Sequence, residues 1–243
     1  GFGPFPGGFV IIPFGDARAL QKAITPNTAG FLVEPIQGEG GINVPEEGYL
    51  AAIRKICSDK NVCLVFDEIQ TGLGRTGTLL AEEHEHVKAD LTIIGKSLGG
   101  GFLPVSAVLA RGDLLDVFGP GEHGSTFGGN PLACAVGRSA LRVIAEEGLV
   151  ENSRKMGAHL KKQIEGLESP HVKSVRGRGL MLGIELNESA PTADALSKKL
   201  IESGLLCIPA GERIVRFTPP IILDEEQSGW ALERLAKVLT SRR

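Results

Sequence analysis

Several features that mark other classes of protein are missing from this 243-residue chain. No apolar run approaches the roughly 20 residues that a helix needs to cross a bilayer, so we expect no membrane partner. Long blocks of like charge are also absent, because the 26 basic and 29 acidic residues are interspersed and leave a net charge of −3. This balance offers no electrostatic basis for binding nucleic acid or an anionic surface.

The four cysteines form no CxxC pair and no spacing typical of metal ligands. This pattern favours free thiols in a reducing compartment, and we expect no metal site. Internal repeats and low-complexity segments are absent as well. The chain opens on glycine without a signal-peptide pattern, so we expect a fragment or a processed product. The cysteines are Cys57, Cys63, Cys134 and Cys207.

What is present is the composition of an ordinary globular protein, with 42% hydrophobic and 23% charged residues. The length allows one large or two modest domains. Over residues 1–147, short apolar runs alternate with helical patterns, which predicts an α/β domain with a mostly parallel sheet. Residues 148–243 mix helices with short strands, which predicts a small α+β domain packed on the first.

The individual elements follow from periodicity and capping residues. Glycine and proline make residues 1–15 turn-rich, with a short strand expected over 10–12. In the first domain we expect helices over 17–24 (capped by Asp16), 45–60 and 131–145 (capped by Asn130), and strands over 30–33, 62–66, 91–94 and 105–110. In the second we expect helices over 151–167, 193–203 and the C-terminal end, and strands over 180–186, 205–208 and 214–217.

A single lysine stands at the end of the apolar run over 91–94, after Gly95 and before the glycines at 99–101. Such a run predicts a buried strand that delivers Lys96 to its C-terminal end, where ligands bind in open α/β sheets. The glycines allow the backbone to approach a ligand closely. Apolar neighbours would desolvate the lysine and make its amine a nucleophile; a lysine that merely reaches solvent is the alternative.

An aspartate follows the preceding apolar run in the same way. Asp67 ends the run over 62–66, which is typical of a strand covered on both faces, and a carboxylate there is costly unless it meets a cation or several donors. An N-cap role is the competing interpretation. Glu34 and Glu39 come just past the strand over 30–33, where a solvated loop is the alternative.

Two other motifs are rejected on their context. Residues 72–77 match G-x-G-x-x-G literally. The dinucleotide motif joins a strand directly to a helix, whereas here four polar-rich residues follow the strand and no apolar periodicity follows the motif at once. The cluster over 84–86, His-Glu-His, is flanked by charged residues and indicates a solvated surface rather than a metal site.

A buried aspartate after one parallel strand and a lysine after the next suit one kind of chemistry. The lysine can form an imine with an aldehyde cofactor, and the aspartate can keep a pyridine nitrogen of that cofactor protonated. The protonated ring then accepts electrons when a proton leaves an amino acid. Once displaced by substrate, the lysine can carry that proton. Asp67 and Lys96 are the candidates for these roles.

Four motifs, in order and spacing, resemble the class III pyridoxal-phosphate aminotransferases over essentially the whole chain. The resemblance implies the fold type I of pyridoxal-phosphate-dependent transferases: a large domain whose sheet is mostly parallel, and a small C-terminal domain. It also implies that a phosphate-binding turn, a ring-stacking aromatic and a substrate arginine lie upstream of residue 1. The motifs are Glu34-Pro35-Ile36-Gln37-Gly38-Glu39, Asp67-Glu68-Ile69-Gln70-Thr71-Gly72, Gly95-Lys96-Ser97-Leu98-Gly99-Gly100-Gly101 and His123-Gly124-Ser125-Thr126-Phe127-Gly128-Gly129-Asn130-Pro131.

Roles for individual residues follow from this resemblance alone. Lys96 would be the Schiff-base lysine and Asp67 the partner of the cofactor's pyridinium. Gln70 would bond the phenolic oxygen, and Ile69 would pack on one ring face. Thr126, together with Ser125, would reach the phosphate of a neighbouring subunit's cofactor, which requires a homodimer. Glu39 and Arg216 would form a movable pair that switches the site between a cationic and a dicarboxylate substrate.

Two further segments, Gly1-Phe2-Gly3-Pro4-Phe5 and Leu103-Pro104-Val105-Ser106-Ala107-Val108, resemble the ornithine-specific members of the family. This resemblance implies transfer of the δ-amino group of ornithine to 2-oxoglutarate, giving glutamate and glutamate semialdehyde, in the bacterial cytoplasm or the mitochondrial matrix. Gly40-Gly41 after Glu39 is more similar to acetylornithine enzymes, so an acetylornithine or 4-aminobutyrate aminotransferase is one alternative. A non-catalytic remnant that lacks the N-terminal half is the other.

Overall fold

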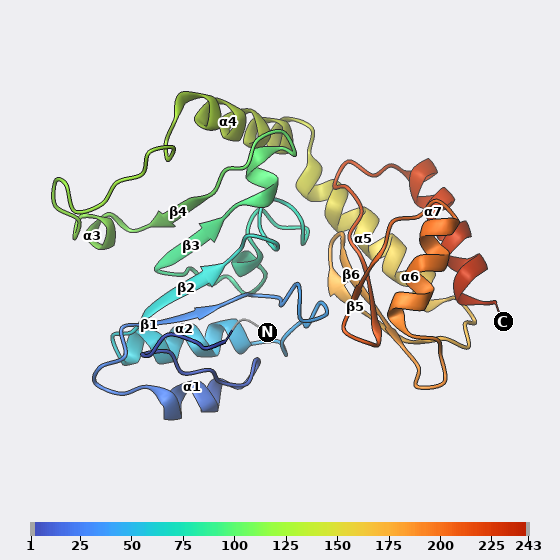
Figure 1. Ribbon diagram of the computed structural model, residues 1–243, viewed down its shortest axis with the longest axis horizontal. Coiled ribbons are helices and arrows are strands. Elements are labelled where there is room, and N and C mark those ends of the chain that lie inside the picture. The colour runs from blue at the N-terminus through green and yellow to red at the C-terminus, as the bar shows by residue number, and fades with distance from the viewer. Residues whose placement is uncertain (1–2, 242–243) are drawn as a thin grey trace.

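The computed structural model describes residues 3–241, which form two sheets with helices packed against each (Figure 1). In the first sheet, β1 (Gly30–Val33), β2 (Cys63–Asp67) and β3 (Leu91–Ile94) are parallel, and β4 (Ala107–Ala110) adds to β3 in the antiparallel sense. The mostly parallel sheet predicted for the first part of the chain is therefore confirmed. Gly1 and Phe2, which begin the predicted turn-rich segment, lie outside the described residues.

Helices cover this sheet unevenly. α1 (Ala17–Ala23) and α2 (Tyr49–Asp59) pack under β1 and β2, where Leu64 and Phe66 of β2 are fully buried. Val65 of β2, which points the other way, remains partly exposed. The prediction that this strand is covered on both faces is therefore met on one face only, because α1 and α2 lie together on the same side (Figure 1).

The predicted capping residues stand where the helices begin. Asp16 accepts a hydrogen bond from the Ala19 N–H at the start of α1, and Asn130 accepts one from Ala133 at the start of α4 (Pro131–Glu146). α2 begins four residues later than predicted, since Gly48 adopts a positive φ of 86° and interrupts the chain between the proline turn and the helix.

The strand predicted over residues 10–12 does not form. Val10 and Ile11 are 76% and 80% exposed, and none of the strands among residues 3–241 pairs with this segment. A short β-branched run has no ladder to stabilise it without a neighbouring strand, so propensity alone was misleading here.

The second sheet is antiparallel throughout, in the order β5-β6-β8-β7. Its helices pack on one face and bury a continuous apolar core, in which Leu160, Ile184 and Leu235 are fully buried. β5 was not predicted, because its Val-Lys-Ser-Val-Arg sequence lacks a clean apolar face. The elements are α5 (Leu149–Glu165), β5 (Val172–Arg178), β6 (Met181–Leu186), α6 (Ala193–Glu202), β7 (Ile208–Ala210), β8 (Ile214–Phe217) and α7 (Glu225–Leu239).

Three short elements complete the chain: the 3₁₀ turns η1 (Ala81–Glu85) and η2 (Lys96–Gly99), and the short helix α3 (Gly112–Leu115). Within residues 3–241, every helix is too short or too polar to cross a membrane. The boundary between the two parts, placed at 147/148 from the sequence, stays a prediction.

Close backbone contacts join the two parts. Arg75, on the glycine-rich turn over 72–77, is largely buried and donates hydrogen bonds to the carbonyls of Leu180 (2.9 Å) and Pro219 (2.5 Å). Its own carbonyl accepts a bond from the Ser153 hydroxyl of α5 (2.9 Å). As a result, the C-terminal ends of β1, β2 and β3 face the second sheet (Figure 1). Residues 72–77 thus form a turn that contacts the second part of the chain rather than a strand-to-helix junction, which agrees with the rejection of a dinucleotide motif.

Candidate active site

Asp67 and Lys96 lie at one edge of the first sheet. β2 and β3 run parallel and in register, with Asp67 opposite Ile93, and the Glu68 N–H donates to the Ile93 carbonyl (2.9 Å). Lys96 follows β3 after a single glycine. The topology therefore brings the predicted carboxylate and amine to the same edge, as expected for consecutive parallel strands.

The environment of Lys96 differs from the prediction in one respect. Its side chain is exposed rather than desolvated by apolar neighbours. The apolar residues nearby turn inward: Ile94 of β3 and Leu98 of η2 are buried in a cluster under α4. The lysine side chain is exposed at the end of the strand instead. The predicted desolvation of Lys96 by apolar neighbours is therefore wrong.

The turn after Asp67 is fixed by hydrogen bonds and by glycines. The Ile69 N–H donates to Asp67 Oδ1 (3.0 Å). Both Cγ atoms of Ile69 would lie 3.6 Å from a side-chain carbon added at Gly95, so Ile69 sits directly against the residue before the lysine. Gln70 is packed on Gly38 so closely that a Cβ there would stand 2.6 Å from its amide carbon. Both side chains are thus held at the same edge.

The pKa of Glu34 depends on the charges of Asp67, Lys96 and Glu39, which places the four residues near one another. Burial raises the pKa of this carboxyl, while the Gly38 N–H, which donates to it at 2.9 Å, lowers the pKa. The charges of Asp67 and Glu39 raise the pKa further, and that of Lys96 lowers it. The sequence indicated Glu34 less clearly than Asp67 and Lys96 as a site residue. Its position among these charges makes it a residue that lines the site.

Glu39 and Arg216 form an ion pair although 177 residues separate them. Arg216 Nη1 lies 2.8 Å from Glu39 Oε1, and Gln70 Nε2 donates to the same oxygen at 3.0 Å. The hydrogen bond from Arg216, and then that from Gln70, lowers the pKa of Glu39. The Arg216 side chain is only 11% exposed, and its Nε has no hydrogen-bond partner among the described residues.

Ser125 and Thr126 are not brought to this cluster. They lie on the exposed loop between α3 and α4, where Ser125 Oγ accepts a bond from the Gly128 N–H (2.8 Å). This loop leaves the sheet from the far end of β4, which runs antiparallel to β3 (Figure 1). Their assigned contact with a neighbouring subunit's cofactor stays a prediction.

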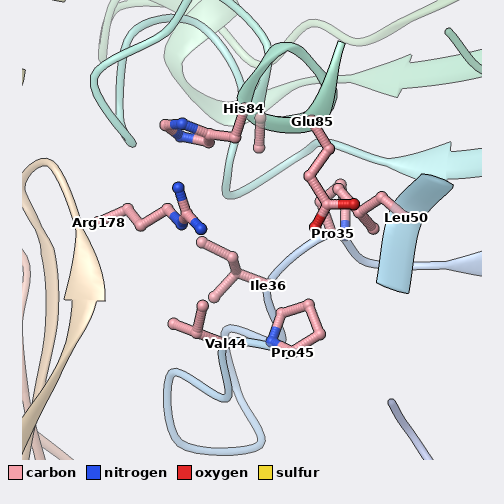
Figure 2. A pocket seen from close by; sticks show the side chains of 9 residues that line it. Pro35, Ile36, Val44, Pro45, Leu50, His84, Glu85 and Arg178 are labelled. Carbon is pink, nitrogen blue, oxygen red and sulfur yellow. The ribbon is translucent and has the colours of Figure 1, made fainter. Parts of the chain in front are cut away.

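The cluster over 84–86 differs from its prediction. His84 is half-buried rather than solvated, and its ring bonds the hydroxyls of Thr76 (3.1 Å) and Thr78 (3.3 Å). Burial, and then the charge of Arg178, lowers its pKa. Figure 2 shows His84 and Arg178 on two sides of a small pocket bordered by Ile36 and Val44. No cluster of potential metal ligands occurs within residues 3–241.

Two functional candidates were missed in the sequence. Arg176 of β5 donates to the carbonyl of Gly41, on the loop that carries Glu39. Glu68 is 1% exposed and bonds the Thr71 hydroxyl and the Glu82 N–H, which fixes the turn after Asp67. The only signal for Glu68 was its place beside Asp67, and Arg176 offered none because its strand was not recognised.

A carboxylate and a lysine at adjacent parallel strand ends, facing a smaller antiparallel domain, define a fold type I transferase of the pyridoxal-phosphate class. Solved structures agree. The ornithine aminotransferase from Toxoplasma gondii, in a structure with partial occupancy of PLP at its active site, superposes with a TM-score of 0.94 at 46% identity, over 98% of this chain and 57% of that one. The acetylornithine aminotransferase from Elizabethkingia anophelis gives 0.92 at 45%, over 97% and 60%.

The chain belongs to the class-III aminotransferases, whose family profile matches residues 7–239. An ornithine aminotransferase from Bordetella pertussis is 53% identical over 239 residues, which are 98% of this chain and 58% of the relative. One from Brevibacillus brevis is 52% identical and is covered over 59% of its length. This chain therefore spans less than two thirds of the curated relatives it matches.

Proposed function

We propose that the complete protein transfers the δ-amino group of ornithine to 2-oxoglutarate, giving glutamate and glutamate semialdehyde, with pyridoxal phosphate as cofactor. Membership of the family and the ornithine aminotransferases among the relatives support this proposal. The observation that carries it is the Glu39–Arg216 pair beside Asp67 and Lys96, since an ornithine enzyme needs an arginine that can be covered and uncovered.

The residues at the sheet edge fit this cofactor chemically. Asp67 supplies a carboxylate for a protonated ring nitrogen, Lys96 an amine for an aldehyde, and Gln70 an amide donor for a phenolic oxygen. Ile69 offers an apolar surface for a ring face, in contact with Gly95. When bound, the cofactor accepts the electron pair left on carbon as a proton departs.

Each side chain then has a distinct task. Asp67, which is only partly buried, would keep the ring nitrogen protonated through the attraction between its carboxylate and that positive charge. Lys96 Nζ would hold the cofactor by its aldehyde carbon. As a free amine it would carry a proton between the cofactor side and the substrate carbon that bears the reacting amino group.

Glu39 and Arg216 select between the two substrates. With the pair closed, the Arg216 charge is neutralised, and the cationic ornithine can enter without like-charge repulsion. With Glu39 turned away, the guanidinium can bind the second carboxylate of 2-oxoglutarate in a bidentate manner. The Nε of Arg216, which is buried and has no hydrogen-bond partner within residues 3–241, would be a further donor once the pair opens.

The proposal also includes assembly and location. Ser125 and Thr126 stand on an exposed loop at the other end of β4, so they suit a contact with the phosphate of a second subunit's cofactor better than one with their own. This arrangement calls for a homodimer. The cytoplasm or the mitochondrial matrix would supply the amino acid and the 2-oxo acid.

Two observations favour acetylornithine as an alternative amino donor. The acetylornithine aminotransferase from Elizabethkingia anophelis matches nearly as well as the ornithine enzymes. In addition, Gly40-Gly41 after Glu39 is similar to the acetylornithine enzymes. We therefore keep acetylornithine as the alternative amino donor, with 4-aminobutyrate behind it.

The test is a set of single-turnover half-reactions on the complete gene product loaded with pyridoxal phosphate. Ornithine, N-acetylornithine and 4-aminobutyrate are compared as amino donors by the change in cofactor absorbance. We expect ornithine to have the highest kcat/KM, because the closed pair neutralises the charge of Arg216 when this cationic substrate enters. A higher value for N-acetylornithine would replace the proposal by its alternative, and inactivity with all three would refute both.

A further inference from the structure

Three residues stand in one row across the second sheet. Arg176 of β5 lies opposite Gly183 of β6, and Gly183 lies opposite Arg216 of β8. Side chains of directly opposed residues on antiparallel strands project from the same face of the sheet. Two arginines therefore flank a glycine on the face that meets the first part of the chain.

The loop after β1 rests on this row. Its Gly41 carbonyl accepts hydrogen bonds from Arg176 Nε (3.0 Å) and Nη2 (2.8 Å). A Cβ at Gly183 would stand 3.0 Å from Ile42 Cβ and 3.3 Å from the Gly41 oxygen. The absence of a side chain at Gly183 is what allows the loop to approach the sheet, and Figure 1 shows this loop reaching across from β1.

The loop is a compact unit, so its two ends move together. Gln37 and Asn43 form a two-way backbone bridge, with both N···O distances at 3.0 Å, and the Asn43 amide bonds the Gln37 side chain at 2.9 Å. Between them, the Gly41 and Ile42 N–H groups donate to the Gly38 carbonyl. Fixing Gly41 therefore also fixes Glu39, two residues away.

Arg176 is itself held in place. Its Nη1 lies 3.5 Å from Glu185 Oε2, and that carboxylate also accepts bonds from Lys173 (2.7 Å) and Ser174 (2.9 Å). The Arg176 side chain is 31% exposed, so it is shielded on most sides. A charged donor fixed by a carboxylate gives stronger hydrogen bonds to a carbonyl than a neutral one does.

We propose that Arg176 is a positioning residue that holds the turn over 38–42 against Gly183, so that Glu39 covers Arg216, and that it thereby sets the preference between the cationic and the dicarboxylate substrate. The inference rests on the proposed function, in which opening of the Glu39–Arg216 pair admits 2-oxoglutarate. Arg176 is remote in sequence from both members of the pair, and its hydrogen bonds reach them through Gly41 of the loop.

The first test compares two variants of the complete, cofactor-loaded protein. Arg176→Gln removes the bidentate bond to Gly41, and Lys173→Gln is the matched control, because it removes a cation that bonds the same Glu185 without touching the loop. We expect Arg176→Gln to lower the ratio of kcat/KM for ornithine to kcat/KM for 2-oxoglutarate about ten-fold, as Arg216 becomes uncovered more often. Lys173→Gln should leave this ratio unchanged.

The second test needs no cofactor and no turnover. Hydrogen–deuterium exchange in the peptide that contains residues 37–43 should be about ten-fold faster in Arg176→Gln than in the parent, while peptides from β6 keep their protection. Gly183→Ala provides an independent variant, since its methyl group would push the same loop away from the sheet. It should shift the substrate ratio in the same direction.

The outcomes separate this inference from the proposed function. A parent protein that turns over neither substrate refutes the function, whatever the exchange data show. A working parent whose Arg176→Gln variant loses both half-reactions equally, or shifts the ratio no more than Lys173→Gln does, overturns the positioning role. Unchanged exchange over residues 37–43 overturns it as well.

Discussion

At the scale of single residues, the backbone of Lys96 has a positive φ of 42°, which costs a residue with a Cβ about 1–2 kcal/mol. Gly95 before it is extended, and the two together turn the chain out of β3 at the sheet edge. The backbone thereby directs the lysine side chain away from the apolar cluster below, at the sheet edge where β2 ends on Asp67.

Replacing this lysine tests its role. Lys96→Ala should reduce transamination by the complete protein more than about 10⁴-fold, because it removes both the amine that holds the cofactor and the base that moves the proton. Steady-state turnover with ornithine and 2-oxoglutarate measures the effect. Lys88→Ala, at an exposed lysine before β3, is the control and should retain activity. Residual turnover within a hundred-fold of the parent would refute the assigned role.

Arg216 predicts an asymmetry between substrates. In Arg216→Ala, the half-reaction with 2-oxoglutarate should lose about 30-fold or more in kcat/KM, since a charged hydrogen-bonded pair worth about 2 kcal/mol or more is removed from that complex. The ornithine half-reaction, in which Glu39 already covers the arginine, should lose less than about five-fold. Single-turnover kinetics measure both, and equal losses would count against the switch.

At the scale of elements, α5 packs on the turn between β5 and β6 through a glycine. A Cβ at Gly157 would overlap the carbonyl of Gly179, so the helix can lie this close only without a side chain there. Gly179 in turn packs against the backbone at Thr76. The helix α5, the turn at Gly179 and the first part of the chain are therefore in contact at this point. A single position in α5 therefore controls the approach of three segments.

Two helical glycines allow a matched comparison. Gly157→Ala should lower the free energy of unfolding by about 1–3 kcal/mol, because the methyl group forces backbone apart. Gly229→Ala, at an exposed site in α7 with open space around it, should raise that free energy by about 0.5–1 kcal/mol through better helix propensity. Urea unfolding measures both, and changes of the same sign at the two sites would contradict the packing argument.

The turn after β2 carries a pH dependence. Burial raises the pKa of Glu68 from its ordinary value of 4.5, although Thr71 and the N–H groups of Ala81 and Glu82 donate to it. Its contribution to stability is therefore complete below pH 4.5 and is lost as the pH rises through the folded-state pKa. Glu68→Gln does not ionise, so the parent's free energy of unfolding should fall relative to the variant's across that window. Parallel urea-derived curves from pH 4 to pH 8 would disprove this.

At the scale of the whole molecule, the division into a parallel α/β part and a smaller α+β part was predictable, because apolar runs and helix caps are local signals. Asp67 and Lys96 were predictable as neighbours, since parallel strands end at one edge. The Glu39–Arg216 pair came from family resemblance alone, and the contact of Arg176 with Gly41 was not foreseen. These contacts span 177 and 135 residues, and no local pattern encodes which loop rests on which strand.

Three features differ from the sequence-based predictions, and each difference has a physical cause. The strand expected over residues 10–12 lacks a pairing partner, and β5 has a polar sequence that pairing with β6 nevertheless stabilises. The expected burial of Lys96 failed because strand apolarity says where the backbone is buried, not where the next side chain points. Tertiary partners decide each of these cases.

The most direct test of the account is borohydride reduction of the complete gene product with added pyridoxal phosphate, followed by peptide mass mapping. We expect one label, on the peptide that contains Lys96, and its loss in Lys96→Ala. Label scattered over exposed lysines of a folded protein, with none enriched at Lys96, would contradict the cofactor site and leave a non-catalytic remnant as the better description.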